Sequence, residues 1–188
     1  MTAIRSSLLY LLDNALTALR TNINTEITAI SSETPFDGSD GDPQSLPSFE
    51  ARNITLGDLP GAPPLAFPAL RITEYEARMR PTVGAGESRG EVDFSVVVYN
   101  AINALSTSNQ DPSHIESLHR ASLAICAGVS SCLEKHLPTM GAYKGIYSVQ
   151  TTSLSSSPGG AERLNRILSL RSEVRVRCLL RMRQSLGI

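Results

Sequence analysis

Histidine and carboxylate side chains are the residues most able to do chemistry, and their spacing in this chain forms no recognisable reactive group. His114 and His119 are five residues apart, so on a helix they would point about 140° apart and could not ligate one metal ion together. Glu74 and Glu76 alternate on an expected strand and are most simply a solvated face beside neighbouring arginines. No nucleophile motif surrounds a serine, and no Walker sequence is present. We therefore expect no enzymatic activity, no metal and no cofactor.

Two further patterns resemble ligand-binding loops, and each departs from its pattern at a required position. The sequence DGSDGD at 37–42 is similar to half of a calcium loop, but Ser48 stands where the twelfth-position glutamate is needed. The sequence PTVGAGESRG at 81–90 imitates a dinucleotide fingerprint, but Arg89 replaces the third glycine and an expected strand follows. We interpret the first as a flexible acidic loop and the second as a hairpin tip.

Several features report on the cellular compartment. The three cysteines, at positions 126, 132 and 178, show no CxxC spacing, which fits small apolar core residues in a reducing cytoplasm. An apolar run at 8–12 follows Arg5 and imitates a secretory signal, but it is short and Asp13 interrupts it. No stretch has the length needed to cross a bilayer. We expect a soluble, unexported protein with no membrane partner.

Arginine is the basic residue that this chain prefers, with fifteen arginines against two lysines. Guanidinium groups suit planar contacts with carboxylate and phosphate, and they tolerate interfaces better than ammonium groups do. Three interpretations remain open for the arginines of the C-terminal strand: contacts with subunits or partners, a plain solvated face, or proximity to DNA. No aromatic residues interleave with them, which argues against stacking on single-stranded nucleic acid. The candidate contact residues are Arg89, Arg171, Arg175, Arg177, Arg181 and Arg183.

Charge is distributed unevenly along the chain although the formal net charge is −1. Residues 1–50 carry seven acidic residues against two arginines, and residues 161–188 carry seven arginines against two glutamates. Such polarity suits a subunit between unlike partners, or a fold that pairs its own two ends.

Hydrophobic periodicity predicts two helices and four strands in one domain spanning 1–188. The C-terminal strand is the clearest, because apolar residues alternate with arginines over some fifteen positions. A change of phase within the first strand predicts a β-bulge near Thr73–Glu74. The segment 31–66, rich in proline and glycine, is expected to be a long irregular loop or arm with one short strand at Ala51–Leu56. The expected elements are a helix over 2–30, strands over 68–80 and 91–99, a helix over 113–136, and strands over 146–154 and 168–182.

This pattern predicts an α+β fold in αββαββ order, with two helices packed on one face of a mainly antiparallel four-stranded sheet. The pattern resembles the tail terminator and tail-completion proteins of long-tailed bacteriophages. The resemblance is carried by the long first helix, the strand entry Phe67-Pro68-Ala69-Leu70-Arg71-Ile72, the glycine-rich hairpin, the Val92–Val98 strand, and the capped helix with its closing pair of strands. It covers most of the chain except 31–66.

The resemblance implies a structural protein of the virion, assembled in the host cytoplasm. Members of the family form a ring, commonly hexameric, that caps the tail tube and joins the tail to the neck or connector. The implied partners are further copies of the chain, the tail tube protein, the neck or connector protein, the sheath, and DNA that passes through the pore without sequence recognition. The alternatives are another neck, head-completion or baseplate component, or a non-viral adaptor module of ferredoxin-like shape.

Overall fold

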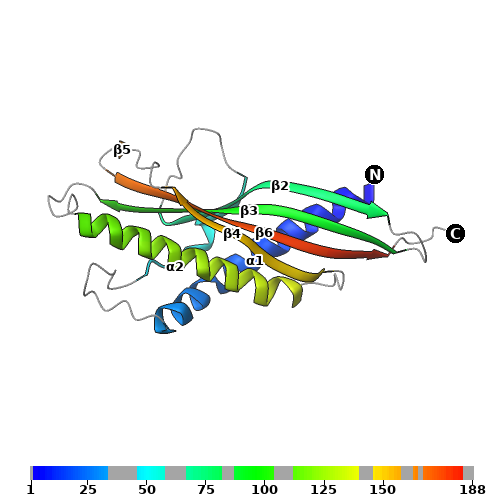
Figure 1. Cartoon of the computed structure of the whole chain (residues 1–188), viewed down its shortest axis with the longest axis horizontal. Helices are drawn as coiled ribbons and strands as arrows, with labels where there is room; N and C mark the ends of the chain where they lie inside the picture. The colour runs from blue at the N-terminus through cyan, green and yellow to red at the C-terminus, as the bar shows by residue number, and fades with distance from the viewer. Residues whose placement is uncertain are drawn as a thin grey trace.

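The computed structural model describes residues 2–33, 46–57, 67–81, 87–103, 112–139, 146–157, 163–164 and 167–183. Two long helices cover one face of a twisted sheet, and their apolar residues join one face of the strands in a single buried cluster. In Figure 1, helix α2 (Pro112–His136) follows the direction of the strands, whereas helix α1 (Thr2–Glu33) crosses them. The core therefore lies between the helix pair and one side of the sheet.

Both helices confirm the prediction from periodicity. In α1 the apolar stripe is buried at Leu12, Leu19 and Ile23, and α2 buries Ile125 and Leu133 in the same core. A short 3-10 turn, η4 (Leu137–Thr139), follows α2 and contains Pro138, which has no backbone N–H to continue the helix. Within the part of the chain that the structure describes, no helix is long and apolar enough to span a membrane.

The long strands also lie close to their expected positions. They are β2 (Ala69–Pro81), β3 (Glu87–Asn103), β4 (Ile146–Ser157) and β6 (Ile167–Arg183). The central antiparallel pair is β3 with β6, which aligns Val96 with Val174 and buries both. The predicted bulge is confirmed, because the β2–β3 register shifts between Thr73 and Glu76.

The predicted four-stranded, mainly antiparallel sheet is wrong. The sheet runs β1-β2-β3-β6-β4, and the two-residue β5 (Arg163–Leu164) also pairs with β6. Strand β1 (Ile54–Leu56) pairs in parallel with β2, with Ile54 opposite Leu70, so the described sheet is mixed. The short strand predicted at Ala51–Leu56 is thus present as β1. Its parallel pairing was not predicted, because such pairing is decided by contacts distant in sequence.

Helix α1 holds β1 in place through side-chain hydrogen bonds to the backbone. The Nη2 and Nε atoms of Arg20 donate to the carbonyl oxygen of Ile54 at 2.8 and 3.1 Å. Nearby, Asn24 donates to the carbonyl of Phe49 and accepts from its amide, at 2.9 and 2.8 Å. A short 3-10 turn, η2 (Ala51–Asn53), connects this anchored backbone to β1.

Part of the predicted 31–66 loop is thus seen to be ordered against α1. Helix α1 continues to Glu33, and residues 46–57 contain η2 and β1. Residues 34–45 and 58–66 lie outside the described residues, as do 82–86 of the glycine-rich hairpin. The single domain and the arm therefore stay predictions.

Candidate contact surface

The face of the sheet opposite the helices gathers the charged residues of three strands. On a strand, alternate side chains point to opposite faces, and residues paired across strands share a face. Because Val92 and Val176 point into the core, Asp93, Arg175 and Arg177 point away from it. Across β3 and β6 the register places Arg171 opposite Tyr99, Arg175 opposite Ser95, and Arg177 opposite Asp93.

Glu173 is the acidic centre of this face. Its carboxylate accepts hydrogen bonds from Ser95 Oγ at 2.9 Å and Arg175 Nε at 2.8 Å, and Arg171 Nη1 lies 3.4 Å away. The Glu173 side chain is only 9% exposed, whereas that of Arg175 is 62% exposed. Burial would raise the pKa of Glu173, but the hydrogen bonds from Arg175 and Ser95 outweigh it and lower that pKa. The carboxylate therefore remains ionised and fixed between two arginines.

Arg177 forms ion pairs with two other carboxylates. Its Nε atom lies 2.9 Å from Asp93 Oδ1 and 2.9 Å from Glu91 Oε1, both on β3. The positive charges of Arg171, Arg175 and Arg177 are thus compensated by carboxylates of the same fold. Their contact with a partner stays a prediction, and any such contact would involve a surface of paired charges.

The remaining candidate arginines lie towards the far end of the same strands. Arg89 is exposed on β3, and its backbone stands opposite that of Arg181, while the backbone of Arg183 stands opposite Glu87. The side chains of Arg181 and Arg183 lie outside the described residues. The structure therefore brings Arg171 and Arg175 together around Glu173, places Arg177 beside Asp93 and Glu91, and places Arg89 apart from them.

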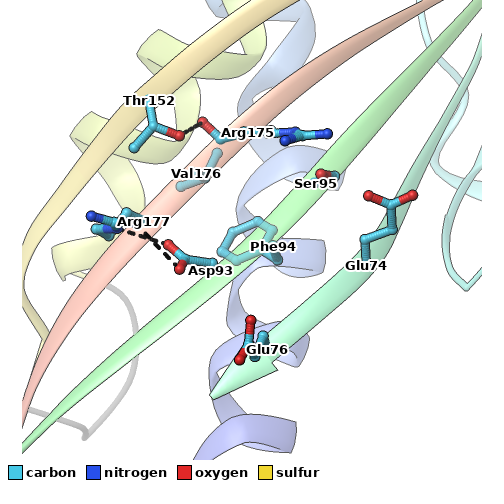
Figure 2. A pocket seen from close by; sticks show the side chains of 9 residues that line it. All are labelled: Glu74, Glu76, Asp93, Phe94, Ser95, Thr152, Arg175, Val176 and Arg177. Atoms are coloured by element: carbon cyan, nitrogen blue, oxygen red, sulfur yellow. Dashed lines mark hydrogen bonds and ion pairs between the residues drawn. The ribbon is translucent and has the colours of Figure 1, made fainter. Parts of the chain in front are cut away.

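A pocket of about 310 Å³ opens on this face where β2 bulges (Figure 2). Its charged and polar lining comes from β2, β3, β4 and β6. Glu74 has a φ of 51° in the bulge, which is unusual for a residue with a side chain. Figure 2 shows its carboxylate on the same side of the sheet as Ser95 and the guanidinium of Arg175. The polar and charged lining residues are Glu74, Glu76, Asp93, Ser95, Thr152, Arg175 and Arg177, and Phe94 and Val176 complete the lining.

The chemistry available in this pocket is recognition of polar or charged groups. Arginines and carboxylates alternate there, so the lining offers both donors and acceptors. Among the described residues, no cluster of three histidine, cysteine, aspartate or glutamate side chains is arranged to hold a metal ion. Sequence reasoning treated Glu74 and Glu76 as a solvated face and missed the pocket. The change of phase at Thr73–Glu74 was the signal that could have located it.

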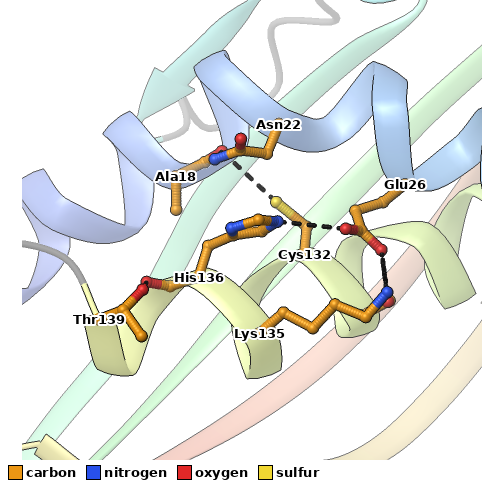
Figure 3. Close-up of polar contacts among 8 residues, drawn as sticks. Ala18, Asn22, Glu26, Cys132, Lys135, His136 and Thr139 are labelled. Atoms are coloured by element: carbon orange, nitrogen blue, oxygen red, sulfur yellow. Dashed lines mark hydrogen bonds and ion pairs between the residues drawn. The ribbon is translucent and has the colours of Figure 1, made fainter.

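A second charged cluster lies between the helices and was not predicted (Figure 3). Glu26 on α1 accepts hydrogen bonds from Ser131 Oγ and Lys135 Nζ on α2, both at 2.7 Å, and its other oxygen lies 3.1 Å from His136 Nε2. Burial would raise the pKa of Glu26, but these hydrogen bonds lower it to about 2. Glu26 is buried and its partners lie on the other helix, with Lys135 largely exposed, so we assign the cluster to holding the helices together.

The cysteines confirm the prediction of small apolar core residues. Cys126, Cys132 and Cys178 are free thiols, and all three are buried. Burial raises the pKa of each thiol to about 12, so none is a reactive thiolate at neutral pH.

Comparison with known proteins adds one remote likeness of fold. No family model matches the chain, and no curated protein matches its sequence. Among solved structures, the chain is similar to one from the virion of the native gene transfer agent (GTA) particle, with a TM-score of 0.39 and 12% sequence identity. The match covers 85% of this chain and 92% of that one. A likeness this remote carries no conclusion about function.

Proposed function

We propose that the protein is a structural component of a tailed bacteriophage virion, and that its copies form a hexameric ring. The ring caps the tail tube and joins the tail to the neck or connector. DNA passes through its pore without sequence recognition. The tail tube protein, the neck or connector protein and the sheath are the neighbours expected for such a ring.

The observation that supports this proposal is the order of the long elements. Helix α1, strands β2 and β3, helix α2 and strands β4 and β6 follow one another along the chain. This is the order on which the resemblance to tail terminator and tail-completion proteins rests.

Electron microscopy of the purified protein tests the proposed ring. Negatively stained particles are expected to be closed rings with a central pore. Fields that contain only single compact subunits would contradict the proposal. Gold labelling of virions that encode the chain then tests its place: label at the junction of tail and head supports the proposal, and label at the distal baseplate contradicts it.

A further inference from the structure

The two edges of the sheet are open in different ways. Strand β4 ends the sheet on one side, and β1 covers β2 on the other side only at Leu70–Ile72. Among the described residues, no strand pairs with the outer side of β4 or of Thr73–Pro81 in β2. An uncovered edge presents backbone N–H and C=O groups that another strand can pair with.

The edge of β4 lacks the charges by which natural proteins block such pairing. Residues 146–157 contain no charged residue, no proline and no glycine. The Thr73–Pro81 edge carries Glu74, Glu76, Arg78 and Arg80, but Arg78 donates to both carboxylate oxygens of Glu76 at 2.9 and 3.0 Å, so these two charges compensate each other and do not oppose an uncharged strand. Glu134 Oε1 accepts a hydrogen bond from the Thr151 amide at 2.9 Å, which covers the edge at that position. From Ser153 to Ser157 the strand pairs with β6 in regular register. That stretch is a regularly paired and uncharged edge.

Each open edge also carries one exposed apolar side chain on the helix-covered side of the sheet. Leu154 is 46% exposed, and it shares a face with Val174 of the core. Tyr75 is 50% exposed, and the bulge places it in phase with Ala77, which packs against the core. Both side chains lie at the border of the core because no further strand continues the sheet beside them.

We propose that Ser153–Ser157 of one protomer pairs edge to edge with Thr73–Pro81 of a second copy, so that Leu154 packs against Tyr75 of that copy. This inference rests on the proposed ring and names its subunit contact. Because the two edges are different and lie on opposite sides of one sheet, the contact is head to tail. Its repetition gives a ring when the rotation between copies closes and a filament when it does not, and the proposed function requires the closed form. Pairing of β4 with β4 would give a two-fold dimer and would leave Tyr75 uncovered.

Disulfide trapping tests the contact. In one chain, positions 75 and 154 are separated by the β3 and β6 strands, a distance of about 14 Å from strand spacing, so no disulfide can form within a subunit. We expect the double variant Leu154→Cys/Tyr75→Cys to give a ladder of covalent oligomers after mild oxidation. Each single variant alone should remain uncrosslinked. The native cysteines are buried and serve as an unreactive background.

The matched control uses Leu123, which is 47% exposed on α2 and lies outside the proposed contact. The variant Leu123→Cys/Tyr75→Cys should give no ladder. Leu154→Asp should convert rings into folded monomers, and Leu123→Asp should leave the rings intact, with folding checked by circular dichroism. Covalent dimers from Leu154→Cys alone, or rings that survive Leu154→Asp, would overturn the inference.

Microscopy and disulfide trapping together distinguish a failure of this contact from a failure of the proposed function. Rings in the microscope without a ladder from the double variant would overturn the contact and leave the proposed function standing. A ladder without closed rings would support the contact and count against the ring-capping function.

Discussion

At the residue scale, the buried carboxylate of Glu26 joins α1 to α2 through Ser131, Lys135 and His136. Its pKa of about 2, lowered from 4.5, links this contact to pH. A carboxyl whose folded pKa is depressed contributes stability above its unfolded pKa, and the contribution is lost as the pH falls through the folded pKa. For Glu26 that window lies between 4.5 and about 2.

Replacement by Glu26→Gln should therefore lower the free energy of unfolding at neutral pH. The pKa difference corresponds to at most roughly 3 kcal/mol, and we expect a loss of about 1–3 kcal/mol. At about pH 2 the wild-type carboxyl has lost most of this advantage, so the difference between the two proteins should shrink. Urea unfolding of both proteins at neutral pH and at about pH 2 measures this difference in the free energy of unfolding.

Glu116→Gln is the control for this pH effect, because Glu116 pairs with Arg120 on the exposed side of α2. An exposed pair of this kind is worth about 0.5 kcal/mol or less. The assignment of Glu26 fails if both variants lose the same stability with the same pH dependence.

Backbone strain at Glu74 gives a second prediction at this scale. A φ of 51° costs a residue with a β-carbon about 1 kcal/mol, and glycine adopts it freely. Glu74→Gly should raise the free energy of unfolding by up to about 1 kcal/mol. Glu76→Gly, two residues further in regular strand, should lower it by about 0.5–1 kcal/mol. Equal losses from both variants in thermal unfolding would contradict the strain argument.

At the scale of elements, α1 and α2 approach closely at Gly128. A β-carbon at that position would lie 2.8 Å from Cγ1 of Ile27, a side chain that is 3% exposed. Alanine favours an isolated helix by about 1 kcal/mol over glycine. Even so, we expect Gly128→Ala to lower the free energy of unfolding by about 1–3 kcal/mol, because the packed helices must move apart.

Chemical denaturation of a double-mutant cycle checks this helix contact. Ile27→Ala removes the atom that the new methyl group would meet, so Gly128→Ala should cost less in that background. Stabilisation by Gly128→Ala in the wild-type background would show that the helices do not pack closely here.

The elements predicted correctly are those whose pattern repeats over many residues. Helices α1 and α2 and strand β6 each span several periods, and the bulge in β2 is visible because the alternation itself changes phase. A short strand was predicted at Ala51–Leu56 and is present as β1, but its place in the sheet could not be predicted, because Ile54 is held by Arg20 from a helix 34 residues earlier in the chain. Parallel pairing of such a short strand depends on that tertiary contact.

For the candidate surface, the sequence predicts contacts between residues of the same strand but not contacts between strands. The position of Glu173 between Arg171 and Arg175 follows from alternation along β6. The pairing of Arg177 with Asp93 depends on the register of β6 against β3, which core packing determines. Glu26 gave no signal, because a carboxylate on a helix resembles a solvated residue until its partners on α2 are known.

At the scale of the whole molecule, the sheet has a face of paired charges and two unlike open edges. Contact with subunits or partners was one of three interpretations of the arginine face, and its charges are largely matched within the fold. The uncharged edge of β4 therefore becomes the stronger candidate for contact between copies. Head-to-tail use of unlike edges fits a closed ring, since each copy offers both halves of the contact.

The molar mass in solution tests this assembly most directly. Light scattering after size exclusion, over a range of protein concentrations, should give one species near six times the 20.2 kDa of the chain. The Leu154→Asp variant should give the mass of the single chain under the same conditions. A wild-type mass of 20.2 kDa at every concentration would contradict the proposed ring.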